Sequence, residues 1–196
     1  MIKLPKPKVD GGMPIERALL RRRSLREYQN RELTLQEMGQ ILWAAQGITD
    51  PMGYRTVPSA GALYPIELCL VAGKVGDLLS GIYSYQPHQH QLKLMAEGDR
   101  RKALGQAALQ QTWIAEAPAV VVITGVYERT MMKYGQRGIQ YVHIEVGHVA
   151  QNIYLQAMSL GLGTVDVGAF WEEQVKQALE IPDEEEPLCI MPLGRP

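Results

Sequence analysis

Hydrophobic positions near the start of the chain recur with the spacing of amphipathic helices. The first predicted helix covers residues 13–23, where Pro14 suits the first helical position. The second begins at a capping box formed by Thr34 and Glu37 and ends at Gly47. Both helices therefore have an apolar face that must pack on something else in the fold.

The rest of the chain alternates between predicted strands and helices. After a Gly- and Pro-rich loop over residues 48–65, predicted strands cover residues 66–72, 82–85, 91–95, 118–126, 164–167 and 188–192. Further helices are predicted from the capping residue Asp99 to about residue 111, from about 141 to 160, and from 171 to 179. This order predicts one α+β domain over residues 1–196, with helices packed on a central mixed or antiparallel sheet. Residues 1–13 are expected to form a flexible N-terminal arm.

Composition is that of one soluble domain. Of the 196 residues, 46% are hydrophobic and 21% are charged, which excludes a disordered or collagen-like chain. The net charge of −1 disfavours binding of nucleic acid over the whole surface. We see no secretory signal and no apolar run long enough to cross a bilayer, so a cytoplasmic location is expected. Cys69 and Cys189 lie in apolar runs, which favours buried free thiols.

Positive charge gathers where the first predicted helix ends. Arg21, Arg22, Arg23 and Arg26 surround Ser24, and guanidinium groups suit the bidentate binding of a phosphate dianion. The alternative is a solvated basic helix end that complements the helix dipole. Binding of nucleic acid or an anionic membrane through residues 3–31 is less favoured, since no aromatic platform accompanies the cluster.

Two other stretches have unusual composition. Residues 57–65 place small side chains between two prolines, which allows the backbone to approach a flat ligand or simply makes a tight connection. Residues 161–170 are Gly-rich but follow a helix, so they are not the strand-then-helix dinucleotide fingerprint. His88 and His90 have no third ligand nearby in the sequence, so no metal site is predicted.

Six motifs occur in an order that resembles one family. They are RRRSLREY, PSAGALYPIE, KYGQRG, GHVAQN, GLGTVDVGAF and the closing MPLGRP. Together they resemble the FMN-dependent nitroreductase-like family from Arg17 to Pro196. The Ser-Ala-Gly loop and the Lys-Tyr pair are similar to its SagB-type branch, which includes azoline oxidases.

The resemblance implies an intertwined homodimer with two FMN sites shared between subunits. Arg22, Arg23 and Ser24 would hold the phosphate and ribityl end, and Arg26 would lie near the isoalloxazine ring. The remaining implied cofactor contacts are Ser59, Ala60, Gly61, Ala62 and Leu63 from the partner subunit, Val167, Gly168 and Ala169 near flavin N5, and Gly194 and Arg195 at the phosphate. Lys133 and Tyr134 would serve proton transfer, although they could also be a surface lysine beside a packing tyrosine.

The function implied is FMN-dependent oxidation and reduction, with hydride transfer through flavin N5 by a ping-pong mechanism. NADH or NADPH is the expected electron donor. Two activities fit: a nitroreductase or flavin reductase, and a SagB-type dehydrogenase of a small or peptide-borne substrate. Ala62 and Tyr64 stand where classical nitroreductases often carry Asn and Gln, which weakens the case for a nitroaromatic specialist. A non-catalytic flavin-binding protein remains the alternative from another class.

Overall fold

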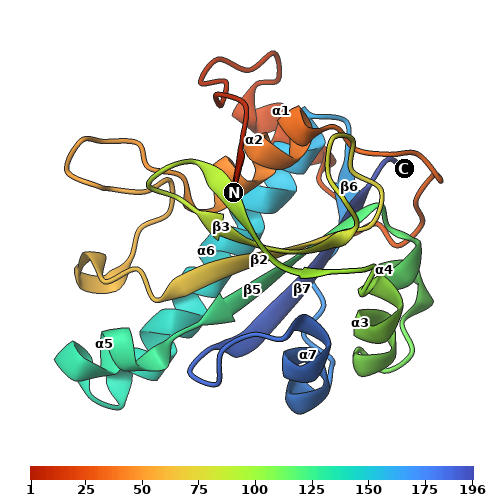
Figure 1. Ribbon diagram of the computed structural model, residues 1–196. Helices are drawn as coiled ribbons and strands as arrows, with labels where there is room; N and C mark the ends of the chain where they lie inside the picture. Colours follow the sequence, from red (N-terminus) through yellow and green to blue (C-terminus); the bar gives the residue numbers. More distant parts are fainter.

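The computed structural model covers residues 1–196 and contains a seven-stranded sheet with helices on both faces (Figure 1). The strands are β1 (Ile2–Lys3), β2 (Ile66–Ala72), β3 (Gly81–Gln86), β4 (Gln91–Glu97), β5 (Ala119–Gly125), β6 (Gly163–Thr164) and β7 (Glu186–Gly194). The helices are α1 (Ile15–Arg21), α2 (Leu35–Gln46), α3 (Arg101–Ala107), α4 (Thr112–Glu116), α5 (Tyr127–Tyr134), α6 (Arg137–Ser159) and α7 (Glu172–Leu179), with a short 3-10 turn over Ala60–Ala62. The α+β fold with an antiparallel sheet, predicted from the sequence, is confirmed.

The strands follow the order β1-β4-β3-β2-β5-β7-β6, and every neighbouring pair is antiparallel. Strand β5 lies near the middle and is buried at every position. Its β-branched side chains suit a strand that is covered on both faces. Successive side chains point to opposite faces, so Val121 and Ile123 enter one core and Val120 and Val122 enter the other.

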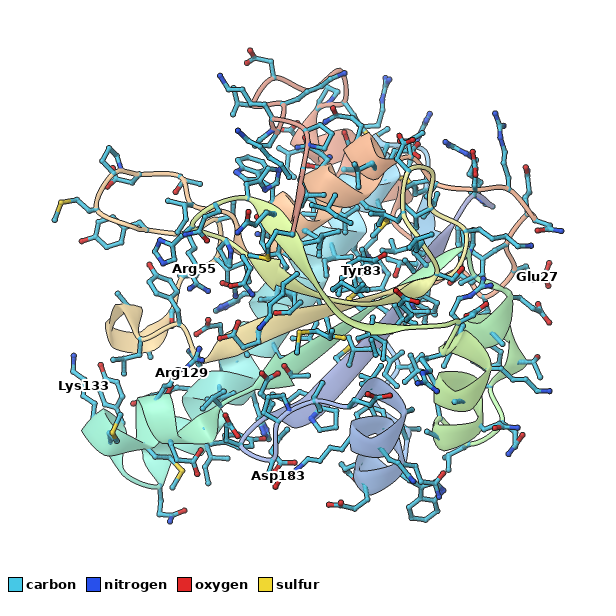
Figure 2. All side chains as sticks on the ribbon, in the orientation of Figure 1. Glu27, Arg55, Tyr83, Arg129, Lys133 and Asp183 are labelled. Atoms are coloured by element: carbon cyan, nitrogen blue, oxygen red, sulfur yellow. The ribbon has the colours of Figure 1, made fainter.

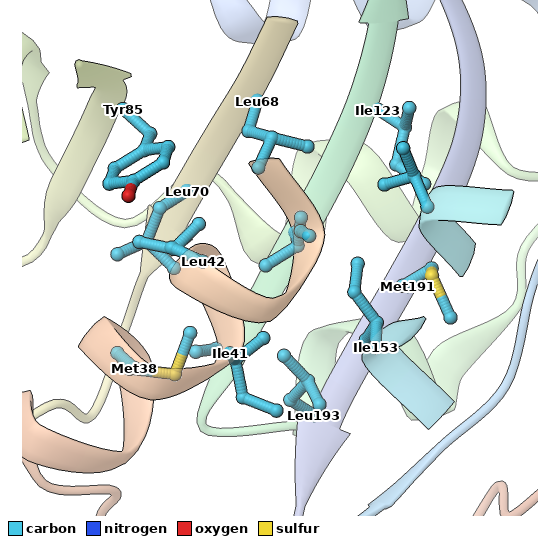
Figure 3. Packing of buried hydrophobic residues seen from close by; sticks show 14 of the residues in the cluster. Met38, Ile41, Leu42, Leu68, Leu70, Tyr85, Ile123, Ile153, Met191 and Leu193 are labelled. Carbon is cyan, nitrogen blue, oxygen red and sulfur yellow. The ribbon is translucent and has the colours of Figure 1, made fainter. Parts of the chain in front are cut away.

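Two hydrophobic cores lie on opposite faces of the sheet. The larger is covered by α2 and α6, and Figure 3 shows Met38 and Leu42 of α2 packed toward Leu70 of β2, with Ile153 of α6 near Met191 of β7. The smaller lies under α3, α4 and α7. Helix α6 is the longest helix and spans the larger core. Segments that pack against its two ends therefore lie far apart.

Most of the predicted elements are found where the sequence predicts them. The capping box of Thr34 and Glu37 is present, with the Glu37 amide donating to Thr34 Oγ1 over 3.2 Å. The helix predicted from Asp99 to about residue 111 is wrong in one respect. It ends at Ala107, because Leu109 and Gln110 adopt positive φ, and the separate helix α4 that follows was not predicted.

Residues 1–13, expected to form a flexible arm, are instead attached at their start. Ile2 and Lys3 form β1 at the edge of the sheet, and Leu4 is buried against the larger core. His90 holds the next residue, since its Nε2 lies 3.0 Å from the Pro5 carbonyl oxygen. A strand of two residues is too short to show the alternation of polar and apolar positions by which strands are predicted.

Cys69 and Cys189 are buried free thiols, as predicted. Burial raises the pKa of each thiol to about 12, so both remain protonated and unreactive near neutral pH. None of the helices has the length and apolar character that crossing a membrane requires.

Candidate functional site

The arginine cluster lies where α1 ends and the chain becomes extended at Arg22. Arg23 Nη1 bonds to the carbonyl oxygens of Leu20 and Arg22 at 3.2 and 2.7 Å. None of the four arginines forms an ion pair with a carboxylate. Arg23 and Arg26 are exposed, so the guanidinium donors that remain after these two bonds are free for an anion from solution.

Ser24 is held by a polar network that reaches the end of α6. The Tyr154 hydroxyl donates to Asp166 Oδ1 over 2.7 Å and accepts the Asp166 amide at 2.9 Å. Its single hydrogen is therefore used, so Ser24 Oγ donates to the Tyr154 oxygen over 3.0 Å. Arg22 lies over the Tyr154 ring at 5.0 Å. Tyr154 and Asp166 support the candidate site and were not predicted: Asp166 lies inside the Gly-rich segment but was not singled out there, and no motif marks Tyr154.

The Gly-rich segment after α6 runs beside this cluster. The Leu25 amide donates to the Thr164 carbonyl over 2.9 Å, and Gly163 is needed because a Cβ there would lie 2.5 Å from Leu25 Cδ1. Val167 exchanges both backbone hydrogen bonds with Ile190 of β7. The next two amides, of Gly168 and Ala169, are exposed and make no hydrogen bond. Two of the three stretches singled out in the sequence are thus brought together.

The residues at the C-terminus have other partners besides any phosphate. Gly194 is buried in β7, where a Cβ would lie 2.8 Å from Tyr28 Cδ1 and 2.9 Å from Pro118 Cδ. Close packing therefore explains this glycine. Arg195 forms an ion pair with Glu37, with 2.6 Å between Nη2 and Oε1. That pair ties the C-terminus to the first turn of α2.

The loop that contains Ser59–Leu63 has a strained backbone. Gly61, Ala62 and Tyr64 have φ of 64°, 54° and 47°. Residues other than glycine rarely adopt this left-handed region. Ser59 stabilises the turn, since its Oγ accepts the Tyr64 amide over 2.9 Å. Such strain persists only where neighbouring groups hold the backbone in place.

Lys133 and Tyr134 lie against this loop at the end of α5. A Cβ on Gly61 would lie 2.9 Å from Lys133 Nζ and 2.8 Å from the Tyr134 hydroxyl oxygen. Lys133 Nζ lies 5.4 Å from the centre of the Tyr134 ring, and Tyr134 packs edge-on against Tyr141 of α6. The pair predicted to transfer protons and the loop predicted to flank a ring are therefore neighbours within one chain.

The arginine cluster and the Lys-Tyr pair lie near opposite ends of α6. The arginine cluster contacts Tyr154, and the Lys-Tyr pair contacts Tyr141. Tyr141 and Tyr154 are thirteen positions apart, which is roughly 20 Å along a helix. In Figure 2, Lys133 and Arg129 lie on one side of the molecule, and Glu27, next to the arginine cluster, lies on the other. The two groups therefore contact α6 at places that are far apart within one chain.

Comparisons with known proteins agree on one family. Residues 19–195 match the profile of the Nitroreductase family. The chain is 49% identical to MJ1384 of Methanocaldococcus jannaschii, which is named as a nitroreductase, across 92% of this chain and 90% of that protein. It is 27% identical to the microcin B17-processing protein McbC of Escherichia coli, across 67% of this chain and 50% of that protein. A crystal structure from Ralstonia eutropha JMP134, also named as a nitroreductase, matches 99% of this chain and 88% of that one, with a TM-score of 0.87 and 29% identity.

Proposed function

Because the chain belongs to the nitroreductase family, we propose that it is an FMN-dependent oxidoreductase. The observation that carries the proposal is a cluster of unpaired guanidinium groups beside free backbone amides. Arg22 and Arg23 have no carboxylate partner, and the amides of Gly168 and Ala169 have no acceptor. A phosphate dianion and a ring nitrogen are the two kinds of group that would satisfy these donors.

The orientation proposed for FMN on these residues is the one that the family resemblance implies. Its phosphate and ribityl chain would bind Arg22, Arg23 and Ser24, with Arg26 near the ring. Gly168 and Ala169 would present amides to N5, while Val167 fixes that segment to β7 and has no free amide to offer. Arg195 and Gly194 would line the phosphate end from the C-terminus. When bound, FMN would supply hydride transfer at N5, and the chain would supply orientation and charge.

The partner subunit would complete each site. The arginine cluster contacts Tyr154 and the Lys-Tyr pair beside the loop contacts Tyr141, and these two tyrosines lie roughly 20 Å apart along α6. This separation favours a ring site that takes its loop from a second chain. A two-fold dimer would turn the loop of one chain toward the arginine cluster of the other. The homodimer with shared FMN sites follows from this separation and from the family resemblance.

NADH or NADPH would donate hydride in the first half of the reaction. The oxidised nicotinamide would leave before the acceptor enters, since both would use the same face of the ring. Stopped-flow reduction of the FMN-loaded protein without oxygen tests this directly. We expect loss of the visible flavin absorbance with at least one nicotinamide. Steady-state turnover with both substrates varied should then give parallel lines in double-reciprocal plots. No reduction by either would leave only a flavin-binding protein.

A SagB-type dehydrogenase is the second candidate, because Lys133 and Tyr134 lie beside the ring-flanking loop. An amine or phenolate placed there could remove a proton while hydride leaves the neighbouring carbon. The similarity to McbC supports this activity. The test compares Lys133→Ala with the unaltered protein in nicotinamide oxidation and in dehydrogenation of an azoline-containing peptide. Loss of only the dehydrogenation supports the second candidate, and loss of neither removes Lys133 from proton transfer.

A further inference from the structure

A buried carboxyl group lies beneath the strained loop and takes no part in the proposed reaction. Glu145 of α6 is only 2% exposed and forms no ion pair. It falls on the apolar stripe of the helix between Val142 and Val149, which face the larger core. A carboxyl at such a position is costly to bury in the ionised form, so its retention calls for an explanation.

Three buried polar atoms without a hydrogen-bond partner are found around this carboxyl. They are Glu145 Oε1, Gln46 Nε2 and Arg55 Nε, and Arg55 Nη1 joins the group by donating to Gln46 Oε1 over 2.8 Å. Ser59 and Gln46 face the Glu145 carboxyl and favour its ionised form, as does the charge of Arg55. Burial opposes them and is the largest effect, so the pKa of Glu145 is raised above its usual range.

The same groups hold the loop that touches Lys133 and Tyr134. Ser59 accepts the Tyr64 amide, and Arg55 lies 4.4 Å from the centre of the Tyr64 ring. Arg129 of α5 donates to the Tyr64 carbonyl oxygen over 3.1 Å. The positive φ of Tyr64 is thus maintained by Ser59, Arg55 and Arg129. Two of these, Ser59 and Arg55, are also the groups that act on Glu145.

We propose that Glu145 is a proton-linked positioning residue, which lets the Ser59–Leu63 loop close firmly on Lys133 and Tyr134 when protonated and loosens the loop when ionised. The direction of the pH dependence follows from the linkage between protonation of Glu145 and loop closure. Opening the loop would hydrate the carboxyl, so the ionised form favours the open loop and the neutral form favours the closed one. The meaning of loop closure for catalysis rests on the proposed function, but the linkage itself does not.

Other charged groups near Glu145 do not reverse this sign. Arg55 is the cation that acts directly on Glu145. Burial raises the pKa of the Glu145 carboxyl but lowers the pKa of the Arg55 guanidinium. Glu67 of β2 and Arg129 of α5 form an ion pair with each other and influence Arg55 with opposite signs. The remaining titratable groups are Tyr64, Tyr85 of β3, and Tyr141 and His148, which lie four positions before and three after Glu145 on α6.

Hydrogen exchange of residues 57–65 in the cofactor-free protein tests the linkage, with rates corrected for intrinsic pH dependence. We expect protection to fall as the pH rises above the ordinary range of a glutamate carboxyl, tenfold for each unit between the open-loop and closed-loop pKa of Glu145. In Glu145→Gln, protection should stay at the low-pH value throughout. A matched control is Glu185→Gln, because burial also raises the pKa of that carboxyl, which bonds to Thr124 of β5 rather than to the loop. This control should keep the pH dependence.

A second variant keeps the test decisive if Glu145→Gln misfolds. Ser59→Ala removes a group that favours the ionised carboxyl, so the midpoint of the protection curve should move to higher pH. An unchanged midpoint in Ser59→Ala, or the same pH dependence in Glu145→Gln as in the unaltered protein, would overturn the proposal. Because no flavin is present, these outcomes are independent of whether the protein is an FMN-dependent enzyme.

Discussion

Gly61 lies directly against Tyr134, so that a Cβ at Gly61 would come within 2.8 Å of the tyrosine hydroxyl oxygen. Lys133 Nζ is nearly as close, at 2.9 Å. A side chain at this position would therefore displace the ends of the Lys133 and Tyr134 side chains. This contact makes the loop and the Lys-Tyr pair one unit, which the following variants separate.

Gly61→Ala should push Lys133 and Tyr134 away from the loop and strain a backbone with φ of 64°. We expect turnover to fall on the order of 100-fold, because small displacements of reacting groups are that costly. Steady-state kinetics and FMN titration measure the two effects. Ala62→Gly is the matched control: it removes a side chain at positive φ, so stability should stay constant or rise by about 1 kcal/mol. Unchanged turnover in Gly61→Ala would show that this contact does not matter to the reaction.

Arg22→Gln should weaken FMN binding by a factor on the order of 10 to 100, because one charge-assisted hydrogen bond to phosphate is lost. Fluorescence quenching on titration with FMN measures the dissociation constant. Arg31→Gln removes the same charge from an exposed site outside the cluster and should leave the constant unchanged. Equal losses in both variants would indicate a general effect of charge and not a phosphate contact.

Arg195→Gln distinguishes two roles at the C-terminus. The ion pair with Glu37 is partly buried, so its loss should lower the free energy of unfolding by roughly 1 kcal/mol. FMN affinity should fall less than in Arg22→Gln, since Nη2 of Arg195 is already used by Glu37. Chemical denaturation measures the free energy of unfolding, and FMN titration measures the dissociation constant. A loss of affinity as large as that of Arg22→Gln would make Arg195 a main phosphate ligand.

Asp99 should make stability depend on pH in the acid range. Arg101 donates to this carboxylate from Nε and Nη2, and these bonds lower the pKa of Asp99 below its usual value. The contribution is therefore present above the unfolded pKa and is lost as the pH falls through the folded pKa. Asp99→Asn should cost about 1–2 kcal/mol at pH 7 and much less in acid.

Urea denaturation at several pH values measures the effect of Asp99. The control is Glu180→Gln, which breaks an exposed pair with Arg100 and should change stability little at any pH. A constant cost of Asp99→Asn from neutral to acid pH would mean that the ion pair with Arg101 is not its source.

How much could be read from the sequence depended on whether each signal was local. The capping box of Thr34 and the apolar run of β5 are signals within a few consecutive residues, and both predictions are confirmed. Strand β1 depends on β4, about ninety residues away, and has only two residues. Helix α5 was not predicted, because it is short and buries only Thr130.

The same limit applies to the site. The arginine cluster and the Gly-rich segment were identified, but Gly194 has a packing role that only its neighbours Tyr28 and Pro118 reveal. The separation of the two groups of site residues along α6 is a property of the fold and of no single motif. Glu145 did carry a signal, because a carboxyl interrupted an apolar helical stripe.

The most direct test of the account is the visible spectrum of the purified protein, with the released cofactor identified by mass and counted per chain. We expect yellow protein with the visible absorbance of a flavin and one FMN for each chain of a dimer. Colourless protein that also fails to take up added FMN would contradict the assignment, and the arginine cluster would then be a solvated helix end.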